Sequence, residues 1–152
     1  MNDKTKKIVA LFILIAFVFS SLAFAIISSL TGGGSSGEEQ LIYNGPLSAS
    51  DEQKLISQNK VVIKIFTATD CADCGPATSS VLKLFQKLGK NIIVENIDTS
   101  YFADEVTSNN LEKFPTTIIL GKGSVRIEAT ISDSELLQKV CGQFSTKPVA
   151  CA

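Results

Sequence analysis

Histidine is absent from this sequence of 152 residues, and that absence narrows the chemistry available to the chain. Ser-His and Cys-His nucleophilic pairs are excluded, and a metal site would need cysteine or carboxylate ligands. Arginine is nearly absent too, since Arg126 is the only one, and the formal net charge is −1. Because the part after residue 30 has no run of basic residues, we expect no nucleic-acid partner.

Charge is also missing from a long stretch near the N-terminus. No charged residue occurs between Lys7 and Glu38, and Ile8 to Leu30 is an apolar run long enough to cross a bilayer as a helix. Lys4, Lys6 and Lys7 precede the run, and basic residues tend to stay on the cytoplasmic side. We therefore predict a single-pass protein of the cell membrane, with residues 1–7 as a cytoplasmic tail and the chain after residue 30 outside.

A cleaved signal peptide is the competing interpretation of the same run. Ala23-Phe24-Ala25 has the small-x-small form of a cleavage site after an apolar core of suitable length. The apolar run continues past this site, through Ile26, Ile27 and Leu30, which favours an anchor that is not cleaved. Both interpretations export the rest of the chain to an oxidising compartment.

The remainder of the chain divides into a linker and one domain. Residues 31–37 are glycine, serine and threonine only, which is typical of a flexible tether. Residues 38–152 are enough for a single core of two or three layers. The expected elements are strands at 40–43, 61–67, 91–97, 116–120 and 125–129, and helices at 50–59, from the cysteine motif to about residue 88, at 101–112 and at 133–144. This order predicts an α/β fold in which a mixed sheet is flanked by helices.

The four cysteines carry the most specific signal. Cys71-Ala-Asp-Cys74 follows the apolar run 61–67 and precedes a helix-like stretch, so the two thiols lie where a strand passes into a helix. A helix N-terminus stabilises a thiolate, and the spacing lets the two sulfurs close a small ring across one turn. We predict a pair that cycles between dithiol and disulfide, in which the more exposed Cys71 exchanges with a partner and Cys74 resolves the mixed disulfide.

Two plainer interpretations of this motif remain open. Half of a zinc site is one, although the remaining cysteines, Cys141 and Cys151, lack the tight spacing that zinc sites usually repeat. A purely structural Cys71–Cys74 disulfide is the other, although so short a loop gains little from closure. We expect neither a metal nor a cofactor.

The element order, the cysteine motif and the triplet Phe114-Pro115-Thr116 together resemble the thioredoxin fold over essentially all of residues 38–152. The separation of Cys71 from Pro115 matches that of ordinary thioredoxins without a gap. The resemblance implies that Pro115 is cis and packs against the redox disulfide, and that Phe114 pairs with an incoming peptide. An ordinary trans turn at Phe114-Pro115 is the alternative.

The sequence also departs from the thioredoxin pattern. Asp70 stands where thioredoxins usually have tryptophan, and Ala72-Asp73 replaces Gly-Pro between the cysteines. Thioredoxins also bury an acid on the preceding strand, and the position that corresponds here is Ile65. Its neighbour Lys64 is a candidate for proton transfer, because a charge in so apolar a strand is unusual; the alternative is that Lys64 reaches the surface.

Cys141 and Cys151 follow near the C-terminus of the chain. An exported chain with an even number of cysteines favours a structural disulfide between them. A second redox pair that relays electrons to Cys71 and Cys74, or two unpaired thiols, remain as alternatives.

Taken together, these features predict a membrane-tethered, extracytoplasmic thiol–disulfide oxidoreductase that acts on protein thiols and disulfides. The resemblance implies a membrane electron-transfer partner, such as the quinone-linked enzymes of the vitamin K epoxide reductase family. One alternative is an extracytoplasmic reductase, for instance in cytochrome maturation. Another is an adaptor that keeps the thioredoxin-like fold without turnover.

Overall fold

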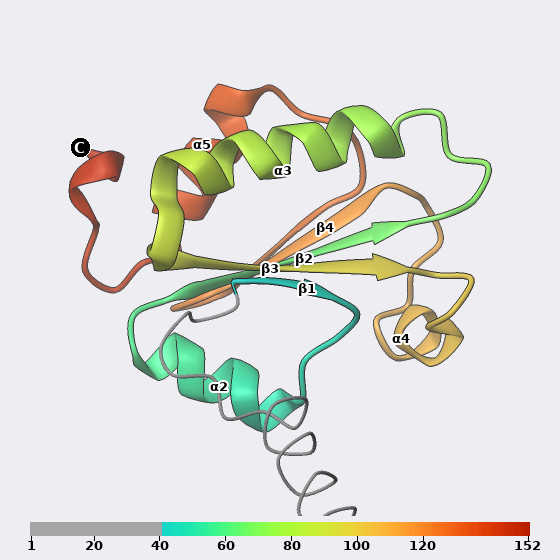
Figure 1. Cartoon of the computed structure of the whole chain (residues 1–152), viewed down its shortest axis with the longest axis horizontal. Helices are drawn as coiled ribbons and strands as arrows, with labels where there is room; N and C mark the ends of the chain where they lie inside the picture. The colour runs from blue at the N-terminus through green and yellow to red at the C-terminus, as the bar shows by residue number, and fades with distance from the viewer. Residues whose placement is uncertain (1–40) are drawn as a thin grey trace, which may run out of the picture. The chain divides into compact units, whose positions relative to one another are not determined.

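The computed structural model describes residues 41–152, which form one α/β domain around a five-stranded sheet (Figure 1). The predicted tail, anchor and linker at 1–7, 8–30 and 31–37 lie outside the described residues. Among residues 41–152, no helix is long and apolar enough to span a membrane. In chain order the elements are β1 (Ile42–Asn44), α2 (Ala49–Ser57), β2 (Val61–Thr67), α3 (Cys74–Leu88), η1 (Gly89–Asn91), β3 (Ile92–Asp98), α4 (Ala103–Ser108), β4 (Thr116–Leu120), β5 (Ser124–Ile127), α5 (Asp133–Cys141) and η2 (Val149–Cys151).

The sheet is mixed, as the element order predicts. Its strands follow the order β1-β3-β2-β4-β5, with β1, β3 and β2 parallel and with β4 and β5 antiparallel to their neighbours. Helices α3 and α5 cover one face, and α2 and α4 lie on the other (Figure 1). The fold therefore buries both faces of the central strand β2, whose residues 61–66 are all buried.

Two apolar clusters hold the layers together, one on each face of the sheet. The larger packs α3 and α5 onto the sheet through residues such as Ile63, Val81 and Val140. The smaller lies on the α4 side and contains Phe66 and Ile97. Val61, Ile63 and Ile65 of β2 enter the larger cluster and Phe66 enters the smaller one, because successive side chains of a strand point to opposite faces.

Several expected boundaries shift because of local hydrogen bonding. The first helix begins at Ala49, because the hydroxyl of Ser48, and not that of Ser50, accepts from the Asp51 N–H. The helix expected over 101–112 is short, and the last helix ends at Cys141. Ser132 caps α5 by accepting a hydrogen bond from the Glu135 N–H, and Gly89 follows the end of α3 with a φ of 52°.

Lys64 lies on the face of the sheet that α2 and α4 cover, and three carboxylates surround it. Its ammonium is 2.7 Å from Glu52 Oε1, 3.8 Å from Glu95 Oε2 and 4.0 Å from Glu105 Oε2. The Leu47 N–H also donates to Glu95 Oε2, whereas Glu95 Oε1 is buried with no hydrogen-bond partner. Burial, partly offset by Lys64 and the Leu47 N–H, raises the pKa of Glu95 to about 7. The surrounding carboxylates raise the pKa of Lys64 above its usual value despite desolvation by burial.

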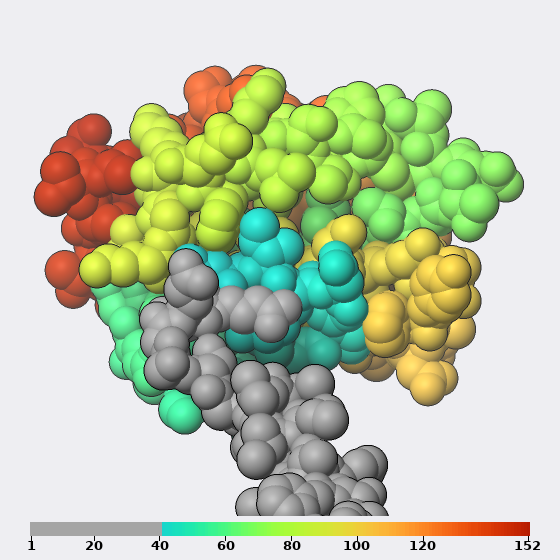
Figure 2. Space-filling view, in the orientation of Figure 1, coloured from blue at the N-terminus to red at the C-terminus, as the bar shows by residue number. Residues whose placement is uncertain are grey.

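The chain ends in a tail that is closed by the disulfide between Cys141 and Cys151. Asn59 donates to the Thr146 carbonyl and accepts from the Thr146 N–H, which holds the tail against the start of β2. The disulfide then joins η2, which contains Cys151, to the end of α5 at Cys141. Figure 2 shows this tail and α4 at opposite ends of the domain.

We expect that replacing Cys141 and Cys151 together by alanine lowers the free energy of unfolding by about 3 kcal/mol, because the open chain gains loop entropy. Urea unfolding of the oxidised proteins measures this difference. The control is the same pair of proteins under strong reductant, where the difference should disappear. A difference that persists under reductant would assign the effect to side-chain packing instead.

Glu95 should make the stability of the domain depend on pH near neutrality. Its pKa is higher in the folded state than the ordinary value of 4.5, so its protonated form stabilises the fold below pH 4.5 and this contribution is lost as the pH rises through about 7. Glu95→Gln mimics the protonated form. Between pH 5 and pH 8 we expect the stability of the variant to improve relative to wild type by roughly 2 kcal/mol.

Denaturant unfolding at a series of pH values measures this change, with Glu112→Gln, an exposed glutamate, as the matched control. A parallel pH profile for Glu95→Gln and wild type would show that Glu95 is ionised throughout this range.

Candidate redox site

The sulfurs of Cys71 and Cys74 are bonded at 2.04 Å, and the Cα atoms of the two residues are 5.4 Å apart. Cys74 is the first residue of α3, and Cys71 lies in the turn between β2 and this helix. The Cys74 N–H donates to the Cys71 carbonyl, which closes the turn. The motif thus occupies the strand-to-helix junction that the sequence predicts.

The two sulfur-bearing residues differ in exposure. Cys71 is half-buried, whereas Cys74 is only 7 % exposed and packs in the first turn of α3. Both lie at the positive end of the helix dipole, which stabilises a thiolate after the disulfide opens. An incoming thiolate therefore finds Cys71 more accessible, and Cys74 is positioned to attack the resulting mixed disulfide from inside.

Charge beside the motif opposes the helix dipole. Asp70 and Asp73 are exposed on either side of Cys71, and the Asp73 side chain makes no capping bond to α3. The carbonyl of Asp73 accepts a hydrogen bond of 3.4 Å from the Thr130 hydroxyl, so the motif is joined to the segment before α5. A negative charge near the sulfur disfavours the thiolate, but at exposed positions its effect is small.

The peptide bond between Phe114 and Pro115 is cis, as the resemblance to thioredoxins implies. Pro115 is buried and directly precedes Thr116, which pairs with Phe66 near the end of β2. Because β2 continues into the cysteine motif, Phe114 and Pro115 lie at the same end of the sheet as Cys71 and Cys74.

Arg126 holds the loop that leads to this proline. Its guanidinium donates to the carbonyls of Asn109 and Asn110, at 3.0 and 2.9 Å, and pairs with Glu128. Asn110 has a positive φ of 49°, so the arginine fixes the chain at a left-handed turn. A lone arginine in a nearly neutral domain is a visible signal in the sequence, but only the structure shows what Arg126 binds.

Lys64 has neither of the two roles considered for it. Its ion pairs are with Glu52, Glu95 and Glu105, on the face of the sheet opposite α3, so it lies away from the helix that carries Cys74. Its side chain is 10 % exposed, so it does not reach the surface either. Ile65, which does face the α3 side, is fully buried in the larger apolar cluster. The carboxylate partners of Lys64 come from three segments that are separate in the sequence, and no sequence pattern predicted them.

The remaining cysteines are bonded to one another and are not brought to the redox motif. Cys141 ends α5, and the next turn, at Gln143, accepts a hydrogen bond from Lys122 in the turn after β4, at the far end of the sheet. No group of histidine, cysteine and acidic residues suited to a metal occurs in residues 41–152.

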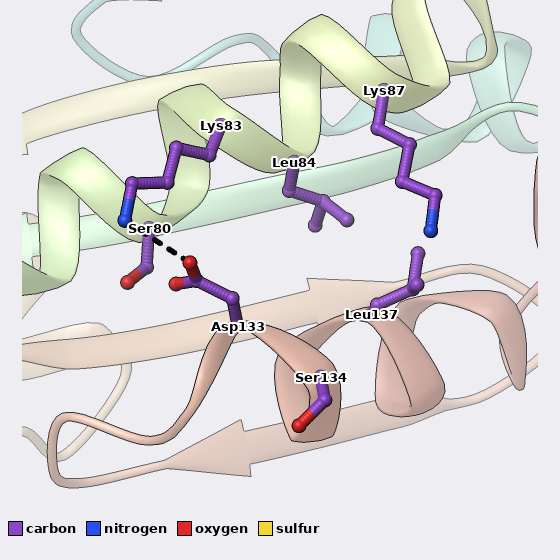
Figure 3. A pocket seen from close by; sticks show the side chains of 7 residues that line it. All are labelled: Ser80, Lys83, Leu84, Lys87, Asp133, Ser134 and Leu137. Carbon is purple, nitrogen blue, oxygen red and sulfur yellow. Dashed lines mark hydrogen bonds and ion pairs between the residues drawn. The ribbon is translucent and has the colours of Figure 1, made fainter.

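Two hollows on the surface of residues 41–152 lie on or beside α5 and not at the redox motif. One, of about 320 Å³, lies between α3 and α5 and is bridged by the ion pair of Lys83 and Asp133, 3.0 Å apart (Figure 3). A second, of about 500 Å³, continues toward Cys141 and Cys151. Neither is lined by Cys71 or Cys74.

Comparison with known proteins agrees with this geometry. A relative of known sequence, "Thioredoxin Y, chloroplastic" of Oryza sativa subsp. japonica, is 30% identical over 94 residues, which cover 60% of this chain and 56% of the relative. The match thus spans little more than half of the relative's length.

Solved structures show the same fold at lower identity. Chloroplastic thioredoxin z superposes with a TM-score of 0.54 at 20% identity, covering 67% of this chain and 95% of that one. A mutant thioredoxin of Halobacterium salinarum NRC-1 gives a TM-score of 0.56 at 19% identity, covering 76% of this chain and 100% of that one.

The family model described as Thioredoxin matches residues 46–141, a span that runs from the segment before α2 to the end of α5 and includes both Cys71-x-x-Cys74 and the cis proline. With the fold, the disulfide at the start of α3 and this match in agreement, the chain belongs to the thioredoxin family.

Proposed function

We propose that this protein is a membrane-tethered, extracytoplasmic thiol–disulfide oxidoreductase that uses Cys71 and Cys74. The observation that carries the proposal is a half-exposed Cys71 bonded to a buried Cys74 at a helix N-terminus, at the same end of the sheet as a cis proline. Membership of the thioredoxin family supports this type of activity.

The exchange follows from the different accessibility of the two sulfurs. When the protein oxidises a client, a client thiolate attacks Cys71, and the electrons of the broken bond leave on Cys74. A second client thiolate then attacks the mixed disulfide, which releases an oxidised client and a Cys71–Cys74 dithiol. When the protein reduces a client, the Cys71 thiolate attacks the client disulfide and Cys74 resolves the intermediate.

The substrates that fit this site are protein thiols and disulfides. The proposed role of Phe114 and Pro115 is to pair with the client backbone beside the sulfurs, and their place at the same end of the sheet as Cys71 supports it. The tether would be the apolar run 8–30, which raises the effective concentration of the domain at a membrane electron-transfer partner, such as a quinone-linked enzyme similar to vitamin K epoxide reductase.

A reductase is the second candidate function, and the two carboxylates beside Cys71 favour it. Because they disfavour a thiolate, Asp70 and Asp73 stabilise the disulfide over the dithiol and lower the reduction potential. A potential well below about −200 mV, with no oxidation of a reduced model substrate, would select the reductase.

The trapping of intermediates tests the proposed roles of the cysteines. We expect Cys74→Ser to accumulate disulfide-linked complexes with client proteins, because the mixed disulfide at Cys71 is then not resolved. Non-reducing electrophoresis of the membrane fraction, with and without reductant, detects them. Cys71→Ser is the matched control and should trap far fewer. Complexes formed mainly by Cys71→Ser would reverse the roles, and the absence of complexes and of insulin-reductase activity would leave a non-catalytic adaptor.

The carboxylates should also tune the potential of the disulfide. Removal of one charge from an exposed site changes the free energy of the thiolate by about 0.5 kcal/mol, which corresponds to roughly 10 mV for two electrons. We therefore expect Asp70→Asn and Asp73→Asn each to raise the potential by this amount, measured by equilibration with glutathione at low ionic strength. Asp133→Asn, on α5, is the control. Unchanged or lower potentials in both variants would show that the carboxylates do not act on the sulfurs.

A further inference from the structure

Lysines gather at the end of the domain that lies opposite the redox disulfide. The strands show this arrangement, because the first residues of β2 and β3 are paired and the last residue of β4 lies beside them. The tail joins the same end through the hydrogen bonds between Asn59 and Thr146. The lysine end, as we call it, consists of Lys54 in the last turn of α2, Lys60 before β2, Lys87 in the last turn of α3, Lys90 before β3, Lys122 in the turn after β4, and Lys147 in the tail.

Acidic residues gather at the other end, around the redox disulfide. They lie at or after the carboxyl ends of β2, β3 and β5, or precede β4, and they comprise Asp70, Asp73, Asp98, Asp104, Glu112 and Glu128. Of the basic residues there, Arg126 is already bound to Glu128 and to two carbonyls, which leaves Lys113. A domain of nearly zero net charge is thus strongly polarised along its strands.

Four lysines of this end, Lys87, Lys90, Lys122 and Lys147, keep their charge available at the surface. All four side chains are exposed. None of the four takes part in the salt bridges found among residues 41–152. Asp133 lines a hollow together with Lys87, but its carboxylate is paired with Lys83.

The chain also enters the domain at the lysine end. Strand β1 is parallel to β3, so its first residue, Ile42, lies toward the end at which β3 begins. The predicted linker leads from the predicted anchor to this strand, and a flexible chain of eleven residues has a typical span of roughly 18 Å. With such a linker, a bilayer that holds the predicted anchor would be within reach of the lysine end.

We propose that the lysine end docks on an anionic lipid surface and turns the Cys71–Cys74 disulfide away from the membrane. The inference rests on the proposed membrane tether. Phosphate-bearing headgroups attract the exposed ammonium groups, while the acidic end is repelled, so attraction and repulsion favour the same orientation. In the docked state the sulfurs face soluble exported clients, and exchange with thiols at the membrane surface requires release of the domain.

The test uses the full chain in vesicles made either of zwitterionic lipid alone or with one third anionic lipid. A membrane-impermeant acetylating reagent modifies the exposed lysines from outside, and mass spectrometry gives the rate at each site. In anionic vesicles we expect Lys87, Lys90 and Lys122 to react about fivefold more slowly than in zwitterionic vesicles. Lys113, near the redox end, is the internal control and should keep its rate. High salt should abolish the protection, because it screens the attraction.

Charge reversal provides the matched variants. Lys90→Glu combined with Lys147→Glu should restore fast acetylation of Lys87 and Lys122 in anionic vesicles, whereas Lys113→Glu should leave their protection intact. Equal rates in both lipid mixtures, or protection of Lys113 alone, would overturn the proposed surface. Protection that appears only when an acidic protein is added would assign the lysine end to a protein partner and would overturn it as well.

The predicted membrane anchor is tested separately, by carbonate extraction of the same vesicles. Alkaline carbonate should leave the chain in the vesicles if residues 8–30 span the bilayer. Extraction by carbonate would contradict the proposed tether, whereas retention without lysine protection would contradict only the docking.

Discussion

Burial of β2 on both faces is the constraint on which the rest of the structure depends. Six consecutive residues, 61–66, are removed from water, and this requires a helical layer on each side and a paired strand at each edge. The strand then ends directly before the cysteine motif, so the element that organises the core also positions the redox disulfide. Phe114 and Pro115 are placed by the same strand, because β4 pairs with it in antiparallel register.

The two disulfides occupy opposite electrostatic environments although both close short loops. Cys74 begins α3, where the helix dipole favours a thiolate, whereas Cys141 ends α5, where the dipole disfavours one. The helix dipole therefore favours opening of the first bond over opening of the second. This difference supports redox exchange at Cys71–Cys74 and a structural role for Cys141–Cys151, which holds the tail beyond Thr146.

The face of the sheet opposite α3 contains the ionisable groups that the redox face lacks. Ile65 and Val94 make the α3 side apolar, while Lys64 and Glu95, paired in register across β2 and β3, lie on the other side with Glu52 and Glu105. The cluster joins β2 and β3 to α2 and α4, and Glu95 is the carboxyl whose pKa burial raises to about 7. Lys64 is thus held by carboxylates on the face of the sheet opposite α3, the helix that Cys74 begins.

The sequence by itself determined the fold class, the central strand 61–67, the helix that ends at Gly89 and the placement of Cys71 and Cys74. Each of these depends on hydrophobic periodicity or on capping residues that are close in the chain. Only the tertiary structure decided that Lys64 pairs with three carboxylates and that Arg126 holds the loop before Pro115. It also decided that lysines from six segments lie at one end. Such contacts join residues distant in sequence, and no local pattern specifies which distant partner a side chain meets.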